Sequence, residues 1–262
     1  MKRFWLSLLG CTFLALMLLV PSAFAAPGID VPSLTEPATY VPADKAVPTD
    51  TASAPKRVEL VLVLDKSGSM SGLESDTIGG FNSMIEKEKK LDADIHVTTV
   101  LFSNDCKLLY DRQRIQAIPP MTDKEYEVGG STALLDAVGS TILKVDKYED
   151  VAQKDKDTKV LFVIITDGME NASSEFTKAK VKEMISDRQE KQGWEFVYLG
   201  ANIDAAKEAG SIGINKENAV KYKNTRRGVL ANFDALSTFV SERANDTPAE
   251  KSHWKEQVEQ DS

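Results

Sequence analysis

The sequence predicts an α/β protein built on an open, mostly parallel sheet with helices on both faces. Three short segments, at 58–64 (VELVLVL), 159–166 (KVLFVIIT) and 194–199 (WEFVYL), are almost entirely apolar. Central parallel strands have this composition because helices cover both of their faces. Between these segments, apolar residues recur at helical spacing. This alternation of strands and helices predicts the fold class.

The elements of the first half follow in chain order. After the strand at 58–64, Ser71-Gly72-Leu73-Glu74 is a capping-box pattern. A helical stripe comes next, formed by Ile78, Phe81, Ile85 and Leu91. Residues 94–102 alternate in polarity and predict a strand, and a second short strand is expected near 107–112.

The second half repeats the alternation. Leu134, Leu135, Val138 and Ile142 predict a helix over 131–145. The apolar strands at 159–166 and 194–199 are each followed by a helix. These two helices are expected around 176–185 and over 225–243.

Residues 1–25 have the composition of a targeting segment. Lys2 and Arg3 precede an uncharged apolar run from 4 to 20, and an A-x-A sequence ends at Ala25. This pattern predicts a cleaved bacterial signal peptide and a periplasmic or secreted chain. The alternative is an uncleaved segment that anchors the chain in the inner membrane, although the run is slightly short for a span. The sequence Leu-Leu-Gly-Cys ending at Cys11 resembles a lipoprotein box, but the apolar run continues past it.

The remaining organisation follows from composition. Residues 26–56 are rich in proline and have no hydrophobic period, which predicts an extended linker before a domain over 57–243. The tail at 244–262 is polar and is expected to fray, and its Trp254 has no evident place. The formal charge of −8 argues against nucleic acid or an anionic membrane as partner. After cleavage only Cys106 remains, and we expect it to be a buried or half-buried hydrophobe.

Side-chain oxygens gather in three loops of this fold. Asp65, Ser67 and Ser69 directly follow the first strand, Thr132 opens a helix, and Asp167 follows the second apolar strand. In open α/β sheets, ligands bind beyond the carboxyl ends of the strands. Residues two apart in an extended segment point the same way, so the first three side chains are expected to converge.

The five side chains are hard donors, two carboxylates and three hydroxyls. With no His or Cys nearby, they favour Mg²⁺, Mn²⁺ or Ca²⁺ over zinc or copper. If the hydroxyls bind directly and the acids through water, the ion stays positive and can accept a carboxylate from another molecule. The alternative is a solvated, hydroxyl-rich turn without a metal.

Asp65-x-Ser67-x-Ser69, Thr132 and Asp167-Gly168 resemble the metal-ion-dependent adhesion site of von Willebrand factor type A domains, shared with integrin inserted domains. The resemblance covers about residues 57–243, and GGSTALLDA and VIITDGMEN further resemble a bacterial and phage-type branch. It implies a doubly wound sheet with one antiparallel edge strand and a divalent ion at its top. It also implies direct coordination by Ser67 and Ser69, direct or water-mediated coordination by Thr132, and mostly water-mediated contacts from Asp65 and Asp167.

Several neighbours have open roles. Glu170 and Asn171 could select a partner at the rim, or Glu170 could be a first-turn helix acid. Asn202 and Asp204 are expected to cap a helix. Asp136 is a candidate for hydrogen bonds that support the site.

The function expected from these residues is an exported binding domain that engages an Asp or Glu carboxylate of a protein partner through Mg²⁺. The competing class is a Mg²⁺-dependent hydrolase or phosphatase, which needs a positioned base or nucleophile. No catalytic residue is predicted: His96 and His253 fall in a strand and in the tail, and Met70 stands where a nucleophile elbow needs serine. A third possibility, implied by the resemblance, is a regulatory subunit of a larger assembly.

Overall fold

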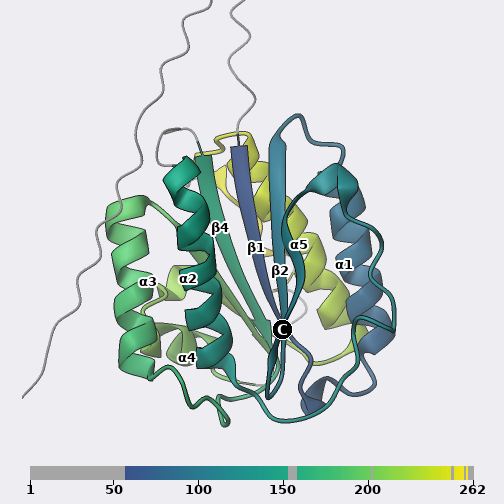
Figure 1. The fold of residues 1–262 in the computed structure, drawn as a ribbon. Helices are drawn as coiled ribbons and strands as arrows, with labels where there is room; N and C mark the ends of the chain where they lie inside the picture. Colours follow the sequence, from purple (N-terminus) through teal and green to yellow (C-terminus); the bar gives the residue numbers. More distant parts are fainter. Residues whose placement is uncertain (1–56, 153–157, 202, 249–250, 257, 259–262) are drawn as a thin grey trace, which may run out of the picture. The chain divides into compact units, whose positions relative to one another are not determined.

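The computed structural model describes residues 57–152, 158–201, 203–248, 251–256 and 258. The predicted signal peptide, the predicted linker and Asn202 lie outside these residues. Six strands form one sheet in the order β3-β2-β1-β4-β5-β6, with helices on both faces (Figure 1). The strands are β1 (Arg57–Asp65), β2 (Asp94–Phe102), β3 (Cys106–Arg114), β4 (Thr158–Thr166), β5 (Glu195–Ala201) and β6 (Ala219–Tyr222). The α-helices are α1 (Glu74–Glu88), α2 (Leu134–Ala152), α3 (Lys178–Gln192), α4 (Ala205–Ser211) and α5 (Arg226–Ala244).

The sheet is parallel except at one edge. β1 pairs in parallel with β2 and β4, and β5 pairs in parallel with β4 and β6. β3 pairs with β2 in the antiparallel sense. The predicted fold class, a doubly wound and mostly parallel sheet with one antiparallel edge strand, is therefore confirmed.

Alternate residues of β1 face two separate cores. Leu60, Leu62 and Leu64 pack with side chains of α1 and α5. Val61 and Val63 pack with side chains of α2 and α3 on the other face. β1 is apolar from Leu60 to Leu64 because both of its faces are covered by helices there. Figure 1 shows the two helical layers on either side of the sheet.

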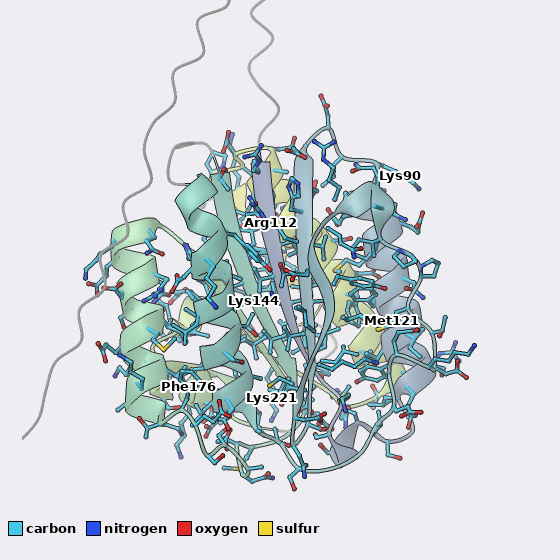
Figure 2. All side chains as sticks on the ribbon, viewed as in Figure 1. Lys90, Arg112, Met121, Lys144, Phe176 and Lys221 are labelled. Carbon is cyan, nitrogen blue, oxygen red and sulfur yellow. The ribbon has the colours of Figure 1, made fainter. Side chains whose placement is uncertain are left out.

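The long segment between β3 and α2 is fixed to α1. The Asn82 side chain donates to the Met121 backbone oxygen at 2.9 Å and accepts from the Met121 backbone nitrogen at 2.8 Å. Figure 2 shows Met121 beside this helix. These bonds bring the chain back toward the carboxyl ends of the strands, where it enters α2.

No residue range was predicted for α4 or β6, although a helix cap was expected at Asp204. β6 has four residues and α4 has seven, too few for a hydrophobic period to stand out. Asp204 caps α4 as expected, because its side chain accepts from the Lys207 backbone nitrogen at 3.1 Å.

The prediction for Cys106 is wrong. Its side chain is exposed, at the first residue of β3. β3 is the edge strand, and of its nine residues only Tyr110 is buried. An edge strand has one neighbour and little cover, so it offers few buried positions.

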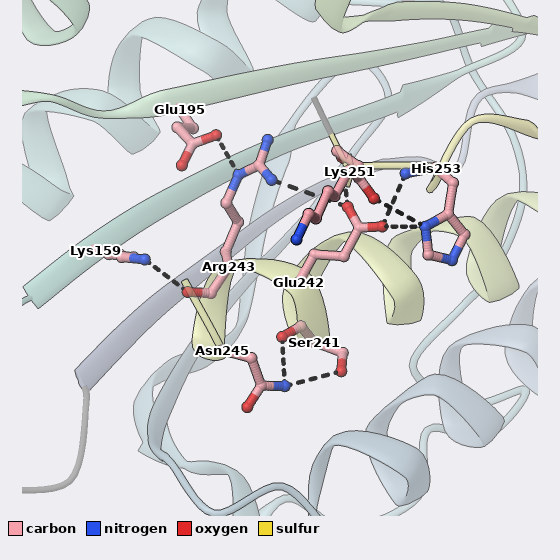
Figure 3. Close-up of polar contacts among 9 residues, drawn as sticks. Lys159, Glu195, Ser241, Glu242, Arg243, Asn245, Lys251 and His253 are labelled. Atoms are coloured by element: carbon pink, nitrogen blue, oxygen red, sulfur yellow. Dashed lines mark hydrogen bonds and ion pairs between the residues drawn. The ribbon is translucent and has the colours of Figure 1, made fainter. Parts of the chain in front are cut away.

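The expected fraying of the tail is contradicted where the tail is described. Trp254 is 4% exposed, its ring centroid lies 5.2 Å from that of Phe239 in α5, and Val258 is fully buried. Glu242 accepts from the His253 backbone nitrogen at 2.9 Å, which joins the tail to the end of α5 (Figure 3). No helix in the described part of the chain is long and apolar enough to cross a membrane.

Candidate metal centre

Three loops meet at the carboxyl ends of β1 and β4. The Gly68 backbone nitrogen donates to the Gly130 oxygen at 3.0 Å, and the Gly129 nitrogen donates to the Lys66 oxygen at 2.8 Å. These bonds join the loop after β1 to the loop before α2. The loop after β4 is joined to the same place, because the Asn171 nitrogen donates to the oxygen of Thr132 at 3.0 Å. The backbone therefore brings all three predicted loops together.

The predicted donor side chains come into contact there. The hydroxyl oxygens of Ser67 and Ser69 lie 3.1 Å apart, and Ser69 donates to Asp167 Oδ1 at 2.5 Å. A Cβ added to Gly168 would lie 3.0 Å from Thr132 Oγ1 and 3.5 Å from Ser69 Oγ. The structure thus places hydroxyls from two loops and a carboxylate from the third around one point.

Asp65 is the most deeply buried carboxylate of this cluster. It is 1% exposed, and its Oδ1 accepts from the Ser67 backbone nitrogen at 2.7 Å. Its Oδ2 accepts from the Thr166 hydroxyl at 2.6 Å. Burial raises the pKa of the Asp65 carboxyl, and the nearby carboxylate of Asp167 raises it further, while the bonds from Ser67 and Thr166 oppose the shift. A positive charge at this point would offset the cost of burying two carboxylates.

Asp167 is held from two sides. It is 5% exposed, and burial raises the pKa of its carboxyl, opposed by hydrogen bonds from Ser69 and Asn224. The amide Nδ2 of Asn224 donates to Asp167 Oδ2 at 2.8 Å. Asn224 was not predicted as a site residue, because it follows the unpredicted strand β6. A lone Asn between Lys223 and Thr225 gives no signal in the sequence.

The local geometry of the first loop differs from the prediction. Gly68–Met70 forms a 3₁₀ turn rather than an extended segment, with Ser67 as the residue before it. The two serine hydroxyls therefore meet because the turn tightens the backbone, not because side chains alternate along a strand. Gly130 has φ of +80°, a conformation that favours glycine, and a Cβ there would overlap the side chain of Asn104.

Glu170 caps a helix rather than facing outward. Its Oε2 accepts from the Leu135 backbone nitrogen at 2.9 Å, in the first turn of α2. Its Oε1 accepts from the backbone nitrogens of Ala172 and Ser173 at 3.0 and 2.7 Å. The geometry favours the structural role over partner selection, because both oxygens bind within the domain.

Asp136 and Asn171 support the loops in the same way. Asp136 accepts from the backbone nitrogens of residues 174–176 at 2.8 to 2.9 Å, which fixes the segment after Asp167. Asn171 Oδ1 accepts from the Thr132 backbone nitrogen at 2.9 Å. The hydrogen bonds expected of Asp136 thus hold the loops of the site rather than its donor atoms.

The donor set fits a small divalent cation. Among the described residues, no three Asp, Glu, His or Cys side chains are grouped as they would be around a metal. A metal here would therefore depend on the hydroxyls of Ser67, Ser69 and Thr132 beside two carboxylates. Such all-oxygen sets suit Mg²⁺, Mn²⁺ or Ca²⁺.

Comparisons with known proteins describe the fold alone. No family model and no curated protein matches the chain. The PilB minor pilin from Streptococcus sanguinis is 10% identical with a TM-score of 0.51, covering 75% of this chain and 64% of that one. A von Willebrand factor type A protein from Catenulispora acidiphila is 12% identical with a TM-score of 0.49, and the match covers 73% of this chain and 43% of that protein. Proximal thread matrix protein 1 from the mussel byssus is 14% identical with a TM-score of 0.47, and the match covers 71% of this chain and 46% of that protein.

The chain spans less than half the length of the last two structures. Its own strand order, antiparallel edge strand and flanking helices form a von Willebrand factor type A-like α/β fold.

Proposed function

We propose that this chain is an exported binding domain that engages an Asp or Glu carboxylate of a protein partner through a divalent cation. Mg²⁺ is the expected ion, with Mn²⁺ and Ca²⁺ as alternatives. The observation that carries the proposal is the meeting of three loops at one sheet edge, with hydroxyls and two buried carboxylates in contact. Ligands of open α/β sheets bind at this edge.

The roles of the side chains follow from their contacts. Ser67, Ser69 and Thr132 would hold the ion through neutral oxygens. Both carboxylate oxygens of Asp65 already accept hydrogen bonds, which suits a residue that supports the ligands rather than neutralising the ion. A bound divalent ion would supply a positive centre that attracts a carboxylate from another molecule.

The metal claim is tested by calorimetric titration of Mg²⁺ and Mn²⁺ into the chain from Ala26 onward. Ser67→Ala and Ser69→Ala each remove one hydroxyl, and each is expected to weaken binding at least about tenfold. The matched control is Ser83→Ala on the exposed side of α1, which should bind like wild type. Equal affinity in the site variants and in the control would refute the metal site.

The partner is tested by capture with and without a chelator. A partner is expected to be retained by wild type in Mg²⁺, to be released by chelator and not to be retained by Ser69→Ala. Such a protein would be identified, and its acidic residues would then be replaced one at a time. The proposal expects one Asp or Glu of the partner to be essential. Retention of the same amount of partner in the presence of chelator and by Ser69→Ala would contradict capture through a metal.

The competing enzyme class is tested on the same variants. Asp65→Asn keeps the shape of the side chain but removes its charge. The proposal expects no Mg²⁺-dependent hydrolysis of phosphate esters by wild type. Turnover that is lost in Asp65→Asn would favour a hydrolase instead.

Export is proposed from residues 1–25 alone. Expression of the full chain in a bacterium, followed by fractionation and N-terminal sequencing, is expected to give a periplasmic or secreted product that begins at Ala26. A full-length product in the inner membrane would instead support the anchored form.

A further inference from the structure

A fourth loop reaches the candidate metal centre, from a part of the chain outside the predicted motif. This loop joins β6 to α5 and contains Asn224. The amide Nδ2 of Asn224 donates to Asp167 Oδ2 at 2.8 Å and lies 3.5 Å from the Ser69 backbone oxygen. Asn224 therefore contacts two of the three loops that carry the predicted ligands.

The loop is held firmly enough to position a side chain. β6 runs parallel to β5, so Tyr222 leaves the sheet at the carboxyl edge. The Thr225 backbone nitrogen donates to the Lys223 oxygen at 2.8 Å, and the Thr225 hydroxyl caps α5 by accepting from the Gly228 nitrogen at 3.2 Å. A Cβ on Gly228 would overlap the Lys223 carbonyl, so only glycine permits this tight turn.

The two oxygens of Asp167 have different donors. Oδ1 accepts from the Ser69 hydroxyl at 2.5 Å, and Oδ2 accepts from Asn224. The bond fixes the orientation of the Asn224 amide, because its oxygen would repel the carboxylate. The carboxylate plane of Asp167 is therefore set by residues from two different loops.

The other end of the amide is an unused acceptor. Asn224 Oδ1 is buried, and no donor for it is found among the described residues. A buried carbonyl oxygen is ordinarily paired with a protein group, a water or an ion. A neutral oxygen of this kind is also a donor type that Mg²⁺ and Ca²⁺ sites use, directly or through water.

We propose that Asn224 is a positioning residue of the metal centre, which orients Asp167 and supplies a neutral oxygen beside the ion. This inference rests on the function proposed above. The identity of the residue matters for charge. An Asp at this position would add a third carboxylate to Asp65 and Asp167, so the negative charge of the site would exceed that of a divalent ion and repel the partner's carboxylate.

The test is calorimetric titration of Mn²⁺ into three variants of the chain from Ala26 onward. Asn224→Ala removes the donor to Asp167 and is expected to weaken Mn²⁺ binding about 10–100-fold. Asn224→Asp has the same shape but also loses the donor and places a carboxylate against that of Asp167, so it is not expected to restore wild-type affinity for Mn²⁺. Asn215→Ala is the control, because Asn215 caps a turn before β6 by accepting from the Glu217 nitrogen at 3.0 Å. It should bind Mn²⁺ like wild type.

A second measurement separates positioning from a general loss of structure. The side-chain amide resonance of Asn224 is expected to shift when diamagnetic Mg²⁺ is added to ¹⁵N-labelled protein, since its hydrogen-bond partner is at the site. Thermal unfolding without metal shows whether Asn224→Ala is folded at the titration temperature.

The outcomes are distinct. Wild-type affinity for Mn²⁺ in folded Asn224→Ala, or an Asn224 amide resonance that ignores Mg²⁺, would overturn the role of Asn224 while the metal centre stands. Absence of metal binding by wild type itself would overturn the proposed function, and this inference with it.

Discussion

Glu88, the last residue of α1, carries a buried carboxyl group far from the candidate metal centre. It is 1% exposed, and its Oε1 accepts from the Ser237 hydroxyl of α5 at 2.7 Å. It borders a cavity of about 550 Å³ whose ionisable lining residues also include Lys87, Asp234, Glu242 and His253. Burial raises the pKa of the Glu88 carboxyl from 4.5 to about 7, opposed by the bond from Ser237 and by the charge of Lys87.

This pKa makes stability depend on pH. The folded chain keeps the proton on Glu88 up to about pH 7, whereas the unfolded chain loses it above 4.5. The free energy of unfolding is therefore expected to fall as the pH rises through this window, by about 3 kcal/mol in all. Glu88→Gln has no proton to lose. Its stability relative to wild type should rise by about 2–3 kcal/mol between pH 5 and pH 8.5, measured by urea unfolding.

The control is Glu86→Gln on the exposed side of the same helix, whose carboxylate pairs with Lys89. An exposed pair contributes under about 1 kcal/mol, so this variant should track wild type at both pH values. A stability difference between Glu88→Gln and wild type that does not change with pH would contradict the raised pKa.

At the scale of elements, α1 and α5 pack closely on one face of the sheet, and both begin near the candidate metal centre. Gly80 of α1 faces Phe233 of α5, and a Cβ at this position would overlap the Phe233 ring. The neighbouring ring of Phe81 meets Phe233 edge to face, with centroids 6.5 Å apart. The glycine thus permits the two helices to approach each other.

Adjacent glycines of α1 should respond oppositely to alanine. Gly80→Ala is expected to lower the free energy of unfolding by about 1–3 kcal/mol, because the added methyl forces the two helices apart. Gly79→Ala should raise it by about 0.5–1 kcal/mol, since nothing lies within 4 Å of its added Cβ and alanine favours the helix. Chemical denaturation of both variants measures this difference. Equal effects would show that the α1–α5 contact is loose.

At the scale of the whole molecule, the C-terminal segment completes the core. Trp254 packs on Phe239 at the end of α5, although it follows that helix by ten residues. Trp254→Ala is expected to cost about 3–5 kcal/mol of unfolding free energy, as loss of a buried tryptophan does. Thermal or urea unfolding of the chain from Ala26 onward measures the cost.

Glu256→Ala is the matched control for this segment. Glu256 is exposed, and its backbone nitrogen donates to the His253 oxygen at 3.1 Å, a bond that alanine keeps. It should change stability by less than about 0.5 kcal/mol. Equal stability of Trp254→Ala and Glu256→Ala would mean that the segment does not contribute to the core.

The sequence was sufficient to predict the fold class and the loops that form the candidate metal centre. The strands at 58–64, 94–102 and 159–166 lie within or match strands of the structure, and the strand at 194–199 overlaps β5, which begins one residue later. These signals are local: a strand covered on both faces is mostly apolar, and a helix repeats its apolar face every three to four residues. Because parallel strands present their carboxyl ends at one edge, Asp65 and Asp167 were expected to meet.

The tertiary structure alone decided how the site is built and supported. Asn224 reaches Asp167 across 57 positions of the chain, and Glu170 caps a helix that begins 36 residues before it. Hydrogen bonds over such separations depend on where strands such as β6 stop and how loops turn, which leaves no period in the sequence. The packing of Trp254 could not be predicted from the sequence for the same reason. Its segment is otherwise polar, and the place where its side chain is buried exists only after the helices have folded onto the sheet.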